Sequence, residues 1–189
     1  MAREPRTRTF EMQRLDVQAF AAAGAALDGT LAQAGFSRLA DSLLPLPGDG
    51  GAPPVGWSAQ GEERPITGGA PQTWLHLQAN THVVLQCQRC LQALHEPLQI
   101  DRWFRFAASE DEAARLDEES EDDVLVASRS FDLQELLEDE LILALPLVPR
   151  HESCPEPLPM AAGEDTLADD EAPANPFAAL AALKRPRGD

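Results

Sequence analysis

All three cysteines of the chain lie in two short motifs whose spacing suits metal ligands. Cys87 and Cys90 form a C-x-x-C pair, and His151 with Cys154 forms an H-x-x-C pair much later in the chain. Two ligands three positions apart can bind one tetrahedral ion, so the two pairs could together make a Cys3His site for Zn²⁺. We take these four residues as candidate metal ligands and zinc as the candidate cofactor.

Two other interpretations of the thiols stay open. A thiol redox enzyme needs its first cysteine at a helix N-terminus, where the helix dipole lowers the thiol pKa. Only a few residues separate Cys90 from Pro97 and the strand expected there, so a long helix does not fit after the motif. Unreactive buried thiols that pack as small apolar groups are the other alternative. An odd cysteine count in a reducing compartment argues against structural disulfides.

No other catalytic pattern is present in the sequence. It contains no phosphate-binding glycine loop, no G-x-S-x-G and no H-E-x-x-H. The remaining histidines, His76, His82 and His95, lie in or beside predicted strands without a nucleophile pattern nearby. We therefore expect a protein that is not an enzyme and has no small-molecule substrate.

The cysteines lie in a region whose apolar residues alternate with a period of two, which is typical of strands. Arg102 stands on the apolar side of the last long strand and breaks its pattern. We expect these segments to form a meander of antiparallel strands. The predicted strands cover residues 55–64, 74–80, 82–87, 97–107 and 124–127.

A helix is predicted after the last strand, where Asp132 and Glu135 have the spacing of a capping box. Leucines and an alanine then recur at helical spacing, and Pro146 marks the end of the helix. Two less regular helical stretches are expected near the N-terminus, at residues 15–27 and 31–43. A loop rich in proline and glycine separates them from the strands.

The chain is strongly acidic, with a formal net charge of −17 from 32 acidic and 15 basic residues. This charge argues against general electrostatic attraction to nucleic acid. Residues 110–123 are mostly acidic and predict a solvated loop or a frayed helix. Their function could be to mimic RNA towards a basic protein, or only to keep the chain soluble.

The segment after Cys154 loses its apolar periodicity and is rich in proline, alanine and acidic residues, which predicts disorder. Within it, Asn175 could cap a short helix at residues 176–184. Its apolar residues and its lysine are candidate partner contacts: Phe177, Leu180, Leu183 and Lys184. The helix could dock on a partner or pack back on its own domain.

These observations predict an α+β fold, a mainly antiparallel β-sheet meander with flanking helices and a disordered acidic C-terminal tail. We expect an N-terminal arm at residues 1–9, a single α+β domain at 10–154 and a flexible tail at 155–189. No segment has the roughly 20 consecutive apolar residues of a membrane helix, and no signal peptide is visible. We expect a cytoplasmic protein without a membrane partner.

Three segments give the chain a family resemblance. They are the strand leading into C-Q-R-C-L at residues 87–91, the acidic leucine helix ending in A-L-P-L-V-P at 144–149, and N-P-F-A-A-L-A-A-L-K at 175–184. In their order and spacing the chain resembles the bacterial YceD family of large ribosomal RNA subunit accumulation proteins. The resemblance implies a non-enzymatic role in the synthesis, processing or stability of 23S rRNA. Some relatives carry further C-x-x-C pairs, which this chain lacks.

The implied partner is 23S rRNA or the pre-50S particle, and the acidity of the chain leaves three mechanisms open. The chain could be a zinc-binding adaptor that captures a basic ribosomal protein without touching RNA. It could bind phosphates directly through a local arginine patch. A metal-dependent enzyme of rRNA maturation is the third. The candidate contacts for direct binding are Arg89, Arg102 and Arg105, with Arg3, Arg6, Arg8 and the basic residues at 184–187.

Overall fold

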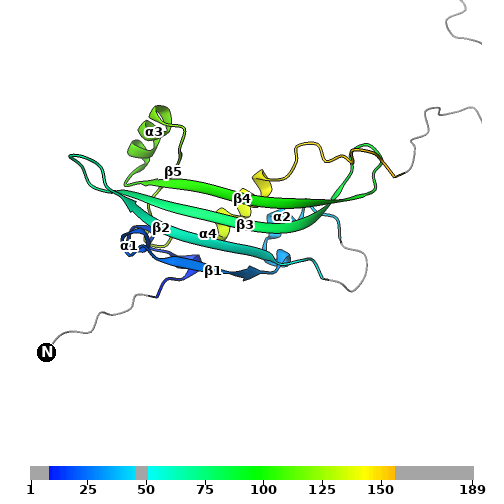
Figure 1. The fold of residues 1–189 in the computed structure, drawn as a ribbon, viewed down its shortest axis with the longest axis horizontal. Helices are drawn as coiled ribbons and strands as arrows, with labels where there is room; N and C mark the ends of the chain where they lie inside the picture. Colours follow the sequence, from blue (N-terminus) through cyan, green and yellow to red (C-terminus); the bar gives the residue numbers. More distant parts are fainter. Residues whose placement is uncertain (1–8, 46–50, 156–189) are drawn as a thin grey trace, which may run out of the picture. The chain divides into compact units, whose positions relative to one another are not determined.

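The structure is a computed structural model and describes residues 9–45 and 51–155. Five strands form one sheet in the order in which they follow along the chain (Figure 1). The first four pair antiparallel as a meander, and the fifth pairs parallel to the fourth. They are β1 (Ala26–Leu31), β2 (Val55–Arg64), β3 (Gln72–Gln86), β4 (Ala93–Ala107) and β5 (Asp123–Val126).

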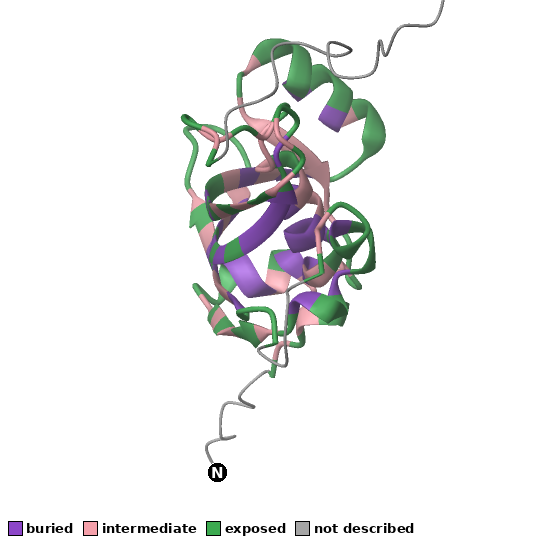
Figure 2. Ribbon diagram, turned by 90° about the vertical axis from the view of Figure 1, so that its right-hand side faces the viewer, coloured by how far each residue is buried: buried purple, intermediate pink, exposed green. Residues whose placement is uncertain are grey.

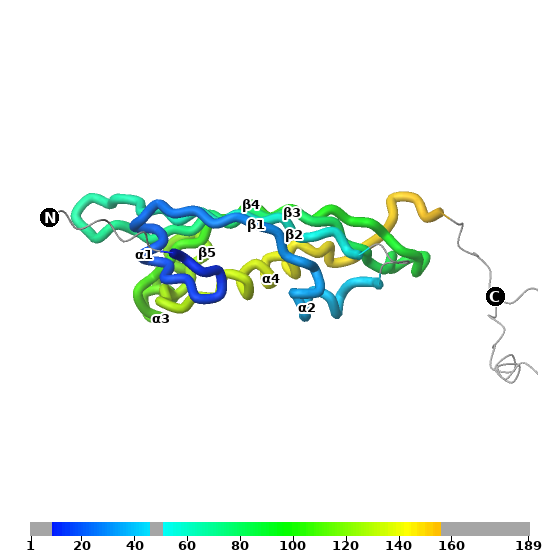
Figure 3. Tube along the Cα trace, turned by 90° about the horizontal axis from the view of Figure 1, so that it is seen from below, coloured from blue at the N-terminus to red at the C-terminus, as the bar shows by residue number. Residues whose placement is uncertain are grey.

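Three helices lie on the same side of the sheet, as Figure 3 shows: α1 (Val17–Ala22), α2 (Ser37–Ala40) and α4 (Leu133–Leu143). Short 3-10 helices occur at Met12–Arg14 and Gln33–Gly35. We call the helix-covered side the inner face and the other side the outer face. The main core lies between the inner face and these helices (Figure 2). The predicted α+β fold with a mainly antiparallel sheet is confirmed.

The two faces follow from the alternation along β3. Leu75, Leu77 and Val83 are buried on the inner face, whereas Gln78 and Asn80 are exposed on the outer face. The strands predicted at residues 74–80 and 82–87 form one continuous strand, β3. The alternation between inner-face and outer-face side chains continues through Thr81, which lies between the two predicted ranges.

Helix α4 is positioned by caps at its own start and at the start of α2. Asp132 accepts hydrogen bonds from the backbone N–H groups of Gln134 and Glu135 at 2.9 and 3.1 Å, which confirms the predicted N-cap. Glu138 accepts from the backbone N–H groups of Arg38 and Leu39 at 2.7 and 3.2 Å, so α4 caps α2. These bonds fix both helices against the inner face.

The N-terminal region differs from the prediction. Residues 15–27 and 31–43 were expected to be helical, but the chain forms strand β1 between two short helices. Gly24, with φ of 55°, ends α1 in the left-handed conformation, and β1 then pairs with β2. Pairing with a distant strand outweighs the local helix preference of the alanine-rich sequence.

The acidic region forms a helix, α3 (Glu110–Glu119), which Ser109 caps by accepting from the Glu112 N–H at 3.3 Å. Ala113 and Leu116 of α3 pack on Ala107 in a small cluster separate from the main core. The prediction of a frayed helix or loop is therefore replaced by a packed, capped helix. None of the helices in the described ranges has the length and apolarity that a membrane span requires. Predictions for residues 1–8 and 156–189 concern positions outside those ranges, so the domain boundaries stay a prediction.

Candidate metal centre

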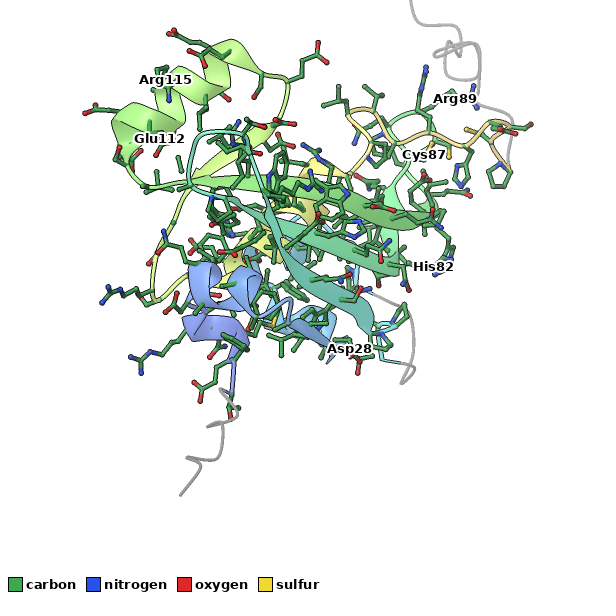
Figure 4. The ribbon with its side chains drawn as sticks, turned by 60° about the vertical axis from the view of Figure 1, so that its left-hand side comes forward. Asp28, His82, Cys87, Arg89, Glu112 and Arg115 are labelled. Carbon is green, nitrogen blue, oxygen red and sulfur yellow. The ribbon has the colours of Figure 1, made fainter. Side chains whose placement is uncertain are left out.

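Two distant segments meet at the end of the hairpin formed by β3 and β4. The turn between the strands is closed by bonds from the Cys87 N–H to the Gln92 carbonyl and from the Leu91 N–H to the Cys87 carbonyl, both 2.9 Å. The segment after α4 lies against this turn, because the Gln88 N–H donates to the Pro149 carbonyl at 2.8 Å. Figure 4 shows Cys87 and Arg89 beside this segment.

The four candidate ligands come together at this junction. The Sγ atoms of Cys87, Cys90 and Cys154 and a ring nitrogen of His151 all lie within 4.8 Å of one another. A tetrahedral zinc ion with Zn–S bonds of about 2.3 Å places its sulfur ligands about 3.8 Å apart. The distance from Cys90 Sγ to His151 Nδ1 is 3.4 Å. The donor set and its dimensions therefore fit Zn²⁺.

The imidazole of His151 has the tautomer that a metal ligand needs. Its Nε2 lies 3.1 Å from the carbonyl oxygen of Ala93, which can only accept a hydrogen bond. Nε2 therefore carries the proton, and in the neutral ring Nδ1 keeps a lone pair directed at Cys90. A carbonyl partner on the second ring nitrogen is the usual way to orient a metal-binding histidine.

Arg89 joins the two ligand pairs. Its Nε donates to Cys154 Sγ at 3.0 Å, and its terminal nitrogen donates to the carbonyl oxygens of His151 and Glu152 at 2.9 and 3.4 Å. The hydrogen bond to Cys154 raises the pKa of Arg89. The sequence predicts this arginine as a candidate RNA contact, whereas in the structure its guanidinium is engaged within the cluster.

The thiols of the first pair have pKa values shifted in opposite directions. Burial raises the pKa of Cys87, but backbone N–H groups of Cys90, His151 and Arg89 outweigh burial and lower it to about 5. The Gln92 N–H lowers the pKa of Cys90, but burial and the neighbouring sulfur atoms outweigh that donor and raise it. The Cys87 side chain is fully buried, which suits a ligand better than the accessible nucleophile of a redox enzyme.

Apolar side chains around the cluster point to solvent. Leu91 is 64% exposed, Leu147 is fully exposed and Val148 is 57% exposed. Leu91 also has a φ of 61°, in the left-handed region that side chains rarely adopt. Burial of apolar surface therefore contributes little to holding this end of the hairpin.

The other candidate contacts are dispersed. Arg102 extends on the inner face, where it pairs with Asp123 and lies 3.7 Å from Glu140. Arg105 lies on the outer face, paired in register with Trp74. The structure does not bring these two arginines together with Arg89 into one patch. The remaining candidates, Phe177, Leu180, Leu183 and Lys184, lie outside the described residues.

A stack of rings on the outer face was missed by the sequence analysis. The rings of His76 and Trp103 are parallel, with centroids 4.3 Å apart. The Arg64 guanidinium lies 4.1 Å from the ring centroid of Trp74 and 4.3 Å from that of Trp103. The alternation along β3 puts Trp74 and His76 on one face, but the stack also depends on how β2 and β4 are aligned with β3.

Comparison with known proteins identifies a family. The model of the family described as "Large ribosomal RNA subunit accumulation protein YceD" matches residues 75–184, a range that contains most of β3, all of β4 and α4, and the four cluster residues. The protein of that name from Haemophilus influenzae is 39% identical over 107 residues, which is 54% of this chain and 60% of the relative. The chain thus spans less than two thirds of that relative's length. No solved structure matches.

Proposed function

Because the chain belongs to the YceD family of large ribosomal RNA subunit accumulation proteins, we propose that it supports accumulation of 23S rRNA and of the large ribosomal subunit. The observation that carries this proposal is the family match across residues 75–184, which includes most of the hairpin, α4 and the cysteine cluster. In this proposal the protein acts by binding and not by catalysis.

The proposal includes a structural Zn²⁺ at the Cys3His cluster. Cys87, Cys90, His151 and Cys154 supply four ligands, so a tetrahedral ion would keep no open position for water or substrate. Such closed sites stabilise a fold, whereas catalytic zinc sites keep a position free. Here the ion would hold the segment after α4 onto the β3–β4 turn. The same closed ligand set disfavours a metal-dependent enzyme of rRNA maturation.

The proposed partner is 23S rRNA or the pre-50S particle, bound directly or through a basic ribosomal protein. Helix α3 offers a surface for the indirect mode, because its first turn holds Glu110, Asp111 and Glu112 and only two of its side chains are buried. Basic proteins are attracted to such a surface.

The test compares cells that lack the chromosomal gene with cells in which that gene is replaced by one encoding the full chain or a variant. We expect loss of the protein to lower the ratio of 23S to 16S rRNA and to reduce the 50S peak in sucrose gradients. The double variant Cys87→Ser/Cys90→Ser should reproduce much of this loss, whereas Gln18→Ala, an exposed position on α1, should not. Normal 23S rRNA and a normal 50S peak in cells without the protein would contradict the proposed function.

Crosslinking in cells separates the two modes of binding. Sequencing of crosslinked RNA and mass spectrometry of crosslinked proteins are performed on one sample. Crosslinks to discrete 23S positions would support direct contact. Recovery of ribosomal proteins without such RNA would support the adaptor.

A further inference from the structure

The outer face of the sheet carries a continuous stack of flat side chains that spans three strands. Arg64 from β2 lies over the rings of Trp74 from β3 and Trp103 from β4. His76 from β3 is parallel to Trp103, with an interplanar angle of 1°. The stack therefore ends in the ring of His76, whose side chain is 20% exposed.

A shallow groove of about 700 Å³ adjoins this end of the stack. Its lining includes carboxylates of β1 and β4 and several amide and hydroxyl groups that can both donate and accept hydrogen bonds. Those uncharged polar groups are Thr30, Ser58, Gln78, Asn80 and Gln99. A flat polar ligand could stack on His76 and bond its edge to these groups.

Asp101 connects the stack to the groove. Its carboxylate is 2.6 Å from His76 Nε2 and accepts from Gln78 Nε2 at 3.1 Å. The hydrogen bonds from His76 and Gln78 lower the pKa of Asp101. The imidazole is thus held in position at the edge of the groove.

The charges on this face suit a single strand better than a duplex. Arg105 is paired in register with Trp74 and forms no ion pair within the described ranges, so its guanidinium is available for a phosphate. Arg64 is paired with Glu62, and Asp101 and Asp28 of the groove add two more carboxylates. Two arginines beside three carboxylates cannot neutralise the dense phosphates of a duplex. Stacking and base-edge hydrogen bonds, which need few phosphate contacts, remain available to a single strand.

We propose that the outer face binds single-stranded RNA, with one base stacked on His76, its edge towards Gln78 and Asn80, and a neighbouring phosphate at Arg105. The choice of RNA as the occupant rests on the proposed function. The proposal also explains how so acidic a chain could contact rRNA, since recognition would come from rings and amides and not from net charge.

The test uses the full-length protein and fluorescein-labelled RNA of about 12 nucleotides, a length within the range that single-strand-binding domains cover. The probes are homopolymers of A, U and C and a mixed sequence containing G, with a duplex for comparison. Anisotropy should show binding of single strands in preference to the duplex. Since one stacked base contributes about 1–3 kcal/mol, His76→Ala should weaken binding at least about fivefold.

Matched variants show whether the ring itself is responsible. His76→Phe keeps a ring for stacking and should bind nearly as the wild type does. His82→Ala removes an exposed histidine of the same strand and face, away from the stack. It should leave the affinity for single-stranded RNA unchanged. Arg105→Ala should weaken binding of all sequences alike and make it less dependent on salt. Circular dichroism and thermal unfolding verify that each variant is folded.

The outcomes that overturn this inference differ from those that overturn the proposed function. Absence of single-strand binding by the wild type at about 50 mM salt, where phosphate contacts are strongest, would overturn the inference. So would wild-type affinity in His76→Ala, or a preference for the duplex. If these results came with a loss of 23S rRNA in cells lacking the protein, the proposed function would stand and a protein partner would be indicated.

Discussion

The helix-covered core and the cysteine cluster are held together by different forces. In the core, Phe20 and Leu137 are completely buried. At the cluster, Leu91, Leu147 and Val148 are all more than half exposed, and the contacts are hydrogen bonds between two distant segments. Apolar burial is non-directional and adds up over many side chains, whereas a ligand cluster depends on the position of each donor atom.

This difference implies different consequences of substitution. A change in the core should lower the free energy of unfolding of the whole domain. A change at the cluster should alter metal affinity and local opening, with little effect on the core.

Truncation of a core ring should have the largest effect on unfolding. Phe20 is fully buried and packs edge to face against Phe10, with ring centroids 5.1 Å apart. Phe20→Ala should lower the free energy of unfolding by about 3–5 kcal/mol, because it removes buried apolar atoms and leaves a cavity. Urea denaturation followed by circular dichroism measures this change. A loss below about 1 kcal/mol would show that the core does not dominate stability.

Removal of the buried carboxylate that caps α2 should have the next largest effect. Burial raises the pKa of Glu138, but hydrogen bonds from Leu39 and Arg38 outweigh burial and lower it. Glu138→Gln should cost about 1.5–3 kcal/mol, the range for hydrogen bonds to a charged group. Since the folded-state pKa lies below the unfolded value of 4.5, the stabilisation should be complete above about pH 4.5 and decline as the pH falls further.

Glu140 on the same helix serves as a control, because its pKa is shifted in the opposite direction. Burial raises the pKa of Glu140, and Arg102 only partly offsets this. Because its folded-state pKa lies above 4.5, its contribution to stability decreases as the pH rises from that value. Glu140→Gln should therefore change stability at neutral pH by less than Glu138→Gln does. Equal losses in the two variants, measured by urea denaturation across the acidic range, would refute this assignment.

At the cluster, Arg89→Ala should weaken zinc binding by about 10–100-fold, as is typical when a partner of a metal ligand is removed. Arg89→Lys should keep only part of the wild-type zinc affinity. A lysine cannot reproduce the planar guanidinium that contacts Cys154 and two carbonyl groups. Competition with a chromogenic chelator gives the affinities. Unchanged affinity in Arg89→Ala would show that this arginine does not position the ligands.

The smallest effect is expected at Leu91. Glycine accepts the left-handed conformation found there without strain, so Leu91→Gly should stabilise the turn by at most about 1 kcal/mol. Leu91→Ala removes the same exposed side chain but keeps the strain, and serves as the control. Hydrogen exchange of the turn amides compares the two. Faster exchange in the glycine variant than in the alanine variant would contradict the expectation.

The sequence predicted the features that depend on local signals. Helix α4 with its Asp132 cap was identified because cap, apolar stripe and terminating proline are adjacent in the chain. The four ligand candidates were identified because each pair has short, regular spacing. Strand β1 was missed, because its conformation depends on pairing with β2 across a long loop. The role of Arg89 and the stack around Trp103 were missed for the same reason, since they depend on segments that meet only in the fold.

We propose that Cys87, Cys90, His151 and Cys154 bind one zinc ion, which orders the end of the hairpin. The most direct measurement is the metal content of the purified full-length protein by inductively coupled plasma mass spectrometry. We expect one zinc per chain in the wild type and in His82→Ala, and almost none in Cys87→Ser/Cys90→Ser. Wild-type protein without zinc after growth in zinc-replete medium, or a double variant that retains it, would contradict the claim.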